Sequence, residues 1–466
     1  MTCRTRLAAS LSVLAAWLAA CAVPGSVRDT APGTAESRNG PFASTYSPAS
    51  IEPVLLTGAT VLTGDGGRLE NASVHIADGV IRSIGSALEV PAGTRTIDAS
   101  GRWITPGIID VHSHIGNYPL PRVEAHGDGN EWSSPNTAGA WAEHAVWPQD
   151  PAFTTARAAG VTSFQVLPGS ANLFGGRGVT LKNVPARTVQ EMKFPGAPHG
   201  LKMACGENPK RVYGPRNMSP MTRMGNVAGQ REAWIAAREY LEKQRRAERG
   251  RDEPPTRDLG LETLAGVLKG EILVHNHCYR ADEMALMIDV AREFGYHPGT
   301  FHHATEAYKI ADLLAEADMC AAMWADWWGF KLEAWDTVRE NVAIVDAAGA
   351  CAIVHSDSPT EVQRLNQEAA KIMAAARRAG LEVTPEHAIR WLTSNAARSL
   401  GIADRVGTLA PGMMADLVVW SGNPFSVYAR AEKVFIDGVL VFDRDDPGSL
   451  WRTDFELGTT VTGGGR

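Results

Sequence analysis

The feature that most constrains this chain is a short, mostly apolar run that ends in two histidines one residue apart. Residues 108–111 follow Pro106-Gly107 and lead into His112-Ser113-His114. An apolar run bounded by a turn signal indicates a buried strand. Side chains two residues apart share one face of a strand, so His112 and His114 could hold one cation. The pair alone is weak evidence, because 13 histidines in 466 residues make this spacing common by chance.

Three later segments also place histidine or aspartate directly after an apolar run. Ile272-Leu273-Val274 leads into His275-Asn276-His277, Gly299-Thr300-Phe301 into His302-His303, and Ala352-Ile353-Val354 into His355-Ser356-Asp357. A single histidine at a strand end is more often structural than a metal ligand. Coincidence is a poor explanation for four such ends in order, so the sequence predicts a metal site built from strand ends.

The middle of the chain, residues 107–401, alternates strand-like and helix-like segments, which is typical of a parallel α/β domain. The predicted strands are 161–166, 201–205, 272–274, 299–301, 319–323 and 351–354. The predicted helices are 282–294, 361–379 and one from Thr384-Pro385 to about Gly401. The length suits one (β/α)8 barrel, with insertions at 117–150 and 207–257.

Both flanks of this middle region have a different, β-rich texture. Short β-forming runs between residues 54 and 104 are separated by turns, with Asp78-Gly79 as a hairpin signal. The same texture returns at 415–420 and 433–439. We therefore assign residues 51–106 and 402–445 to a second β region and residues 446–466 to a C-terminal tail.

The first residues have the pattern of a targeting segment. Arg4 and Arg6 precede an apolar run, residues 7–20, which is too short to span a membrane and suits a signal peptide, residues 1–20. The run ends in Leu-Ala-Ala-Cys21, which resembles the lipobox of bacterial lipoproteins; ordinary secretion is the alternative. Residues 21–50, rich in Ser, Pro, Gly and Ala, predict a disordered tether. Either reading places the protein on the periplasmic side of a bacterial envelope.

The net charge of the chain limits which partners are expected. Lys and Arg number 45 against 52 Asp and Glu, a net charge of −7, and the only basic cluster is 243–246. Nucleic acid is therefore not an expected partner, and membrane contact is expected only through the lipid anchor.

Four cysteines, Cys205, Cys278, Cys320 and Cys351, lie in separate apolar segments without paired spacing. We expect buried core thiols and leave a disulfide and the oligomeric state open.

The segment Pro-Gly-Ile-Ile-Asp-Val-His-Ser-His, residues 106–114, resembles the first barrel strand of the amidohydrolase superfamily. The later strand ends are similar to its prolidase-like and imidazolonepropionase-like branch. The resemblance implies a (β/α)8 TIM barrel of metal-dependent hydrolases with a small β-sandwich domain built from both chain ends. It also implies a ligand after the fourth strand, single histidines after the fifth and sixth, and an aspartate after the eighth.

Carried onto this chain, the resemblance names the metal ligands His112, His114, His275, His303 and Asp357. His277 shares the face of His275 nearer solvent. The chain departs from the pattern twice, with His302 where glutamate is usual and His355 where glycine is common. The choice between His302 and His303 as ligand stays open, with His302 placed near the substrate.

The fourth strand offers two ligands, Lys202 and Glu207. Alternation in 201–205 directs Lys202 into the barrel, where a lone ammonium is costly and loses its proton beside cations. The resemblance then implies a carboxylated Lys202 that bridges two metal ions. Glu207, directly after Gly206, is the alternative ligand, and otherwise lies near the substrate. The number of metal ions stays open with this choice.

These residues predict hydrolysis of an amide bond. Imidazole and carboxylate ligands suit Zn2+, one or two ions, with Mn2+ or Co2+ as alternatives. Asp357 is the predicted general base and acid, and His303 or His277 the predicted holder of the carbonyl oxygen. Gly175-Gly176 resembles a backbone-lined substrate loop, with a plain turn as the alternative.

The expected function is that of a prolidase-like dipeptidase or N-acyl amino acid amidase. A mononuclear cyclic amidohydrolase of the imidazolonepropionase kind, or a deaminase, is the alternative. A non-catalytic envelope binding protein on a degenerate barrel is the third interpretation, and the complete ligand set argues against it.

Overall fold

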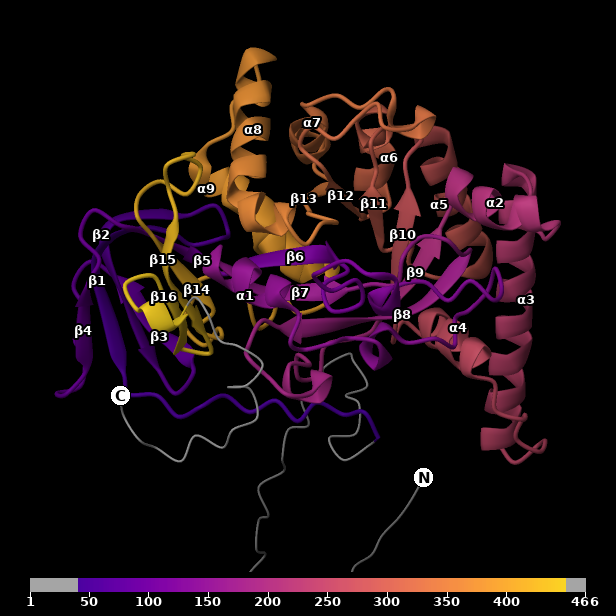
Figure 1. The fold of residues 1–466 in the computed structure, drawn as a ribbon, viewed down its shortest axis with the longest axis horizontal. Coiled ribbons are helices and arrows are strands. Elements are labelled where there is room, and N and C mark those ends of the chain that lie inside the picture. Colours follow the sequence, from indigo (N-terminus) through magenta and orange to yellow (C-terminus); the bar gives the residue numbers. More distant parts are fainter. Residues whose placement is uncertain (1–40, 450–466) are drawn as a thin grey trace, which may run out of the picture. The chain divides into compact units, whose positions relative to one another are not determined.

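The computed structural model describes residues 41–449, which form two eight-stranded sheets (Figure 1). The predicted signal peptide, Cys21 and most of the tether and tail lie outside the described residues. No helix of the described part is long and apolar enough to cross a membrane.

The first of these sheets is a nearly closed barrel whose strands follow one another in chain order. The strands are β6 (Ile108–Ser113), β7 (Val161–Val166), β8 (Phe174–Lys182), β9 (Gly200–Ala204), β10 (Leu273–Cys278), β11 (Thr300–His303), β12 (Cys320–Met323) and β13 (Cys351–Val354). Most of their apolar residues belong to one large core, and a smaller core joins alternate residues of β6, β12 and β13 to residues 396–402. Consecutive order brings the C-terminal ends of seven strands to one rim.

The strand β8 is the exception to the predicted eight parallel strands. It pairs antiparallel with both β7 and β9. Residues 167–173 between β7 and β8 are too few for the crossover that a parallel neighbour requires, so the chain turns back as a hairpin. The Gly-rich run 174–178 therefore forms part of a strand and neither a loop nor a turn, which corrects the conformation expected for Gly175-Gly176.

Side-chain and backbone hydrogen bonds link the first and last strands of the barrel. Asp110 on β6 accepts hydrogen bonds from the backbone N–H and the hydroxyl of Ser356, just after β13. The backbone N–H of Asp357 donates to the carbonyl of His112 at 3.0 Å. Asp110 is fully buried, and burial raises its pKa to about 6.

Helices cover the outside of the barrel and its rim (Figure 1). They are α1 (Pro151–Ala158), α2 (Glu207–Tyr213), α3 (Arg223–Glu248), α4 (Leu259–Leu268), α5 (Ala281–Phe294), α6 (Ala311–Glu316), α7 (Asn341–Ala347), α8 (Leu365–Arg378), α9 (Pro385–Ala388) and α10 (Ser394–Ser399). The helix predicted from Thr384 is broken into α9, a 3-10 turn (Ile389–Leu392) and α10, because Thr393 leaves the helical conformation with φ −133° and ψ −90°.

The other sheet unites both flanks of the chain. Its strands are β1 (Val54–Leu62), β2 (Arg68–Ala77), β3 (Val80–Gly85), β4 (Arg95–Asp98), β5 (Trp103–Pro106), β14 (Leu417–Trp420), β15 (Ala431–Ile436) and β16 (Val439–Asp443). The N-terminal and C-terminal parts meet where β14 pairs antiparallel with β5. Both predicted flanks thus contribute to one structure, while its division into two sandwich layers stays a prediction.

The folded part begins before the predicted boundary at residue 51. The hydroxyl of Ser44 donates to the Lys193 carbonyl at 2.6 Å, and the N–H of Thr45 donates to the Gln190 carbonyl at 3.0 Å. The Tyr46 hydroxyl donates to Asp437. Residues 44–46 of the predicted tether therefore contact the folded body.

Two disulfides correct the expectation of free core thiols. Cys205 pairs with Cys278 and Cys320 with Cys351. Each pair joins neighbouring strands: Cys320 and Cys351 are register partners on β12 and β13. The pairing was not visible in sequence because strand neighbours are distant along the chain.

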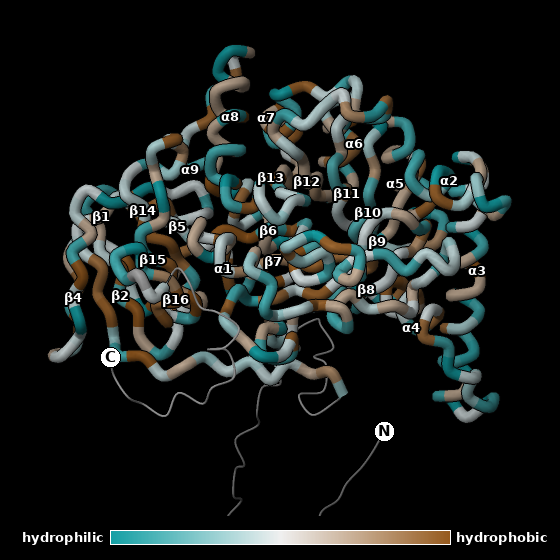
Figure 2. The backbone as a smooth tube through the Cα atoms, in the orientation of Figure 1, coloured by the Kyte–Doolittle hydropathy of each residue, from teal (hydrophilic) through white to brown (hydrophobic). Residues whose placement is uncertain are grey.

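Figure 2 shows these barrel strands as apolar segments inside more hydrophilic helices such as α3.

Candidate active site

The rim of the barrel gathers a cluster of titratable side chains from the strand ends. We use histidine cluster for His112, His114, His277, His303, His355 and Asp357. His112 lies one residue before the end of β6, His277 lies on β10, and His303 ends β11. His355 and Asp357 follow β13, as the apolar run before them predicts.

The centre of the cluster is the carboxylate of Asp357. Its Oδ1 lies 3.2 Å from His114 Nε2 and 3.5 Å from His112 Nε2, and its Oδ2 lies 3.9 Å from His303 Nδ1. Burial alone raises the pKa of Asp357, but the hydrogen bond with His114 and nearby positive charges outweigh it, so the pKa falls below its usual value. Asp357 is therefore ionised at neutral pH.

A backbone carbonyl fixes the orientation of the His114 ring. Its Nδ1 lies 2.8 Å from the carbonyl oxygen of Leu167, which can only accept, so Nδ1 carries the proton. In the neutral ring the lone pair is then on Nε2, which faces Asp357 at 3.2 Å, so a metal ion between the two could replace the hydrogen bond that His114 makes with this carboxylate. This is the arrangement in which a histidine serves as a metal ligand.

A second, deeper row of side chains supports His112. His112 Nδ1 lies 2.9 Å from His302 Nδ1, and His302 Nε2 lies 2.9 Å from His275 Nδ1. His275 Nε2 lies 3.2 Å from Gln165 Nε2. Both ring nitrogens of His302 and of His275 are thus engaged. Gln165 was not singled out in the sequence, because a glutamine inside a strand carries no distinctive signal.

The free nitrogens of the cluster fit a metal ion. Among the described residues, both ring nitrogens of His277 and His355 and Nδ1 of His303 are buried without a hydrogen-bond partner. Burial lowers the pKa of His355 to about 3 and those of His277 and His303 well below the usual value, so all three rings are neutral. Buried lone pairs without partners are costly unless an ion engages them.

Two ligand groups lie close enough to hold an ion, with their donor atoms within 4.8 Å of one another. One joins His112, His114 and Asp357, and the other joins His112, His303 and His355. His355 was noted in sequence only as a departure and was not predicted as a ligand. The predicted ligand His275 lies in the deeper row, and its ligand role stays a prediction.

The side chain of Lys202 lies inside the barrel, as strand alternation predicts. It is fully buried, and its Nζ lies 3.2 Å from His112 Nε2. Burial lowers the pKa of this ammonium to about 8. Lys202 therefore stands beside the cluster in a form that readily loses its proton.

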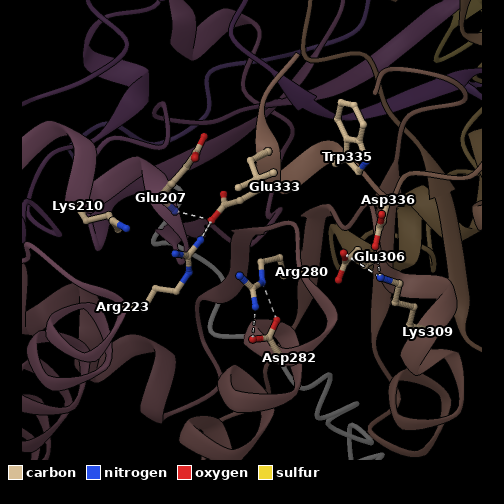
Figure 3. Close-up of a pocket in the computed structure, with 11 residues that line it drawn as sticks. Glu207, Lys210, Arg223, Arg280, Asp282, Glu306, Lys309, Glu333, Trp335 and Asp336 are labelled. Atoms are coloured by element: carbon tan, nitrogen blue, oxygen red, sulfur yellow. Dashed lines mark hydrogen bonds and ion pairs between the residues drawn. The ribbon is translucent and has the colours of Figure 1, made fainter. Parts of the chain in front are cut away.

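The other predicted residue of the fourth strand, Glu207, begins α2 farther out on the rim. Its carboxylate lies 3.6 Å from Lys331 Nζ and 3.7 Å from Arg211 Nη1. Its backbone N–H donates to Glu333 at 2.8 Å. Figure 3 shows Glu207 and Arg223 converging on Glu333 at one end of a pocket of about 530 Å³.

The predicted substrate residues occupy different depths. Gly175 and Gly176 are buried in β8, where a side chain at Gly176 would lie 2.2 Å from the Ala140 carbonyl oxygen. His302 lies in the deeper row described above. Substrate contact by these residues stays a prediction.

The comparisons agree with this geometry. Residues 103–441 match the model of the amidohydrolase family, which covers the barrel and the C-terminal part of the other sheet. The chain belongs to the amidohydrolase family. Membership places the protein among hydrolases that act on carbon–nitrogen bonds.

Two curated relatives illustrate the range of this family. Amidohydrolase tasK of Hapsidospora irregularis is 34% identical over 380 residues, which are 77% of this chain and 38% of tasK. The match thus spans well under half the length of that relative. An imidazolonepropionase of Deinococcus deserti is 25% identical over 374 residues, covering 75% of this chain and 86% of the relative.

Solved structures share the fold. An amidohydrolase from Thermotoga maritima is 36% identical with a TM-score of 0.78, covering 84% of this chain and 100% of that chain. A prolidase crystallised with n-methylphosphonate-l-proline is 19% identical with a TM-score of 0.53, covering 84% and 99%, and shows the fold alone. The predicted superfamily is confirmed, with neighbours of both predicted kinds.

Proposed function

We propose that this protein is a metal-dependent hydrolase that cleaves the amide bond of a dipeptide or an N-acyl amino acid. The observation that carries the proposal is the ionised carboxylate of Asp357 between His112 and His114, beside buried ring nitrogens that have no partner among the described residues. This donor set suits zinc, with manganese or cobalt on the same ligands.

The metal would be held by His112, His114 and Asp357, with His303 and His355 as the second group. A divalent ion at such ligands supplies Lewis acidity and a water acidic enough to react at neutral pH. Asp357 accepts the proton of the attacking water and returns it to the leaving nitrogen. A ring N–H of His303 or His277 holds the developing negative charge on the carbonyl oxygen.

Lys202 completes this arrangement as a carboxylated lysine. Its full burial, its lowered pKa and its 3.2 Å approach to His112 support a neutral amine that takes up carbon dioxide. The resulting carbamate adds a negative charge that would bridge two ions. The alternative, a single ion with Glu207 as ligand, has less support because Glu207 contacts Lys331 and Arg211 instead of the cluster.

The test combines metal analysis with turnover. The purified mature protein is expected to contain one or two equivalents of zinc or manganese and to hydrolyse members of a panel of dipeptides, N-acyl amino acids and cyclic amides. Asp357→Asn is expected to lower kcat by at least about a hundredfold. Protein without metal that zinc and manganese do not activate would contradict the proposal. Turnover of cyclic amides alone would favour the imidazolonepropionase-like alternative.

A further inference from the structure

The segment after β12, residues 324–335, is unusually aromatic and lies on the rim beside the histidine cluster. We call it the aromatic loop; it reads Trp-Ala-Asp-Trp-Trp-Gly-Phe-Lys-Leu-Glu-Ala-Trp. The proposed mechanism uses none of its side chains. We propose that this loop binds a large apolar side chain of the substrate beside the scissile amide, which makes the enzyme selective for aromatic or branched aliphatic residues. The inference rests on the proposed function and names its substrate class.

A continuous stack of rings joins the loop to the cluster. Trp324 stacks on His303 with ring centroids 4.3 Å apart, and its Nε1 donates to the Ser356 carbonyl at 3.2 Å. Trp327 stacks on Trp324 at 5.1 Å, and Phe330 meets Trp324 edge-on at 5.9 Å. The apolar surface therefore starts at a candidate metal ligand and runs outward, so a substrate bound at the cluster lies against it.

The loop also exposes apolar side chains to solvent. Phe330, within the stack, is 57% exposed. Trp328 is 53% exposed, Leu332 81% and Trp335 62%, and the rings of Trp328 and Trp335 form a separate pair 6.0 Å apart. Two of the three exposed tryptophans in residues 41–449 lie in this loop. Contiguous exposed apolar surface marks a binding site more often than a single exposed residue does. Leu332 and Trp335 are the two apolar residues that line the 530 Å³ pocket, whose other nine lining residues are charged, and Figure 3 shows Trp335 at its edge.

The loop is held rigidly enough to act as a preformed surface. Buried Glu333 accepts from the Glu207 N–H and pairs with Arg223. Lys331 Nζ lies 3.7 Å from the ring centre of Tyr279 and 3.6 Å from Glu333. A surface ordered before binding spends less free energy on ordering when the ligand arrives.

The charges around the loop favour a small substrate over a membrane. Residues 324–340 carry four acidic and two basic side chains: Asp326, Glu333, Asp336 and Glu340 against Lys331 and Arg339. Proteins that dock on anionic lipid use basic residues beside their apolar ones. The excess of acid here opposes such docking.

The test compares matched substrates that differ in one side chain. The pairs are N-acetyl-alanine with N-acetyl-phenylalanine and alanyl-proline with phenylalanyl-proline. The phenylalanine member is expected to have at least about tenfold higher kcat/KM in one pair. Trp328→Ala/Trp335→Ala and the milder Leu332→Ser are expected to bring that ratio toward one. Tyr428→Ala, at a 90% exposed position between β14 and β15, is the matched control and should keep the ratio.

Calorimetric binding of N-acetyl-phenylalanine and N-acetyl-alanine to the metal-free protein separates the two proposals. Tighter binding of the phenylalanine compound that the loop variants lose supports the inference even if nothing is hydrolysed, an outcome that contradicts only the proposed function. Hydrolysis with equal kcat/KM for both members of each pair overturns the inference and leaves the function standing. Unchanged selectivity in the loop variants, with lost binding to phosphatidylglycerol vesicles or a changed sedimentation coefficient, also overturns it and assigns the loop to a membrane or to a second copy.

Discussion

In the hydrogen-bonded row behind His112, a bound metal ion would determine which ring nitrogens donate and which accept. A metal on His112 Nε2 needs that lone pair, so His112 Nδ1 must carry the proton and donate to His302 Nδ1, 2.9 Å away. His302 then donates from Nε2 to His275, whose own Nε2–H needs an acceptor. Gln165 Oε1 is buried without a partner among the described side chains, and rotating the amide brings it to His275. Gln165 would then anchor the whole row.

We therefore expect Gln165→Leu to weaken zinc binding by about tenfold to a hundredfold, the usual effect of losing a hydrogen-bond partner behind a ligand. Gln165→Glu, which keeps an acceptor, should bind zinc close to the wild-type level. Competition with a chromophoric chelator measures both constants. Equal affinities in Gln165→Leu and wild type would show that the row does not orient His112.

The two candidate metal ligands of the fourth strand, Lys202 and Glu207, predict different metal contents for their alanine variants. If Lys202 is the carboxylated bridge, Lys202→Ala should lose one metal equivalent and most activity, and a short carboxylic acid at high concentration should restore part of both. Glu207→Ala should keep its metal and change substrate KM. Elemental analysis of the two variants decides between them, because the outcomes exchange if Glu207 is the ligand.

The site residues that the sequence could predict were those that directly follow apolar runs. His112, His114, His303 and Asp357 meet at the rim because strand ends do so in any parallel barrel. The direction of the strand predicted that His277 lies nearer solvent than His275, but which of the two rows offers the free ring nitrogens could not be predicted, because that depends on contacts with other strands. Trp324 and Gln165 could not be found, because tryptophan and glutamine in apolar segments also occur as ordinary core residues.

Among the elements, the strand β6 and the segment after β13 depend on one buried carboxyl. The folded pKa of Asp110, about 6, lies above its ordinary value of 3.8. The stability that its protonated form gives is fully present below about pH 4 and is lost as the pH rises through 6. The shift corresponds to about 3 kcal/mol.

We expect Asp110→Asn not to show the loss of stability that the ionisation of Asp110 causes as the pH rises. Urea unfolding of the metal-free wild type and variant at pH 5 and pH 7.5 measures this loss, because the histidine cluster contributes equally to both proteins. The wild type should lose more stability over this interval than the variant does. An identical change in both would mean that Asp110 ionises in the folded protein as it does in the unfolded chain.

The elements themselves were largely predictable where apolar period and length agreed. β7 and β13 match their predicted ranges, and α5 lies within one residue of its own, ending at Phe294 before Gly295 with φ +75°. β8 was missed because its glycines are typical of loops, and strand direction is a property of the connection rather than of the residues. The broken helix α9–α10 was missed because its apolar pattern continues across Thr393.

At the scale of the whole molecule, the disulfides are relevant to the cellular compartment in which the protein folds. Two bridges between strand neighbours agree with an oxidising compartment such as the periplasm. They support the proposal of an exported protein that is lipidated at Cys21. Cys21→Ala should then move from the membrane fraction to the soluble fraction, measured by fractionation and immunoblotting. A variant that partitions like the parent would point to another anchor.

The antiparallel strand β8 also affects the order in which the chain assembles. β7, β8 and β9 form a local meander, whereas the bonds between Asp110 and Ser356 join residues 246 apart in sequence. Contacts between nearby residues cost less chain entropy, so the meander can form early and the seam between β6 and β13 late. The histidine cluster has members on both sides of that seam. Capture of a metal ion thus becomes possible only at the last step of folding, and a chain that holds its ion is one that has finished folding.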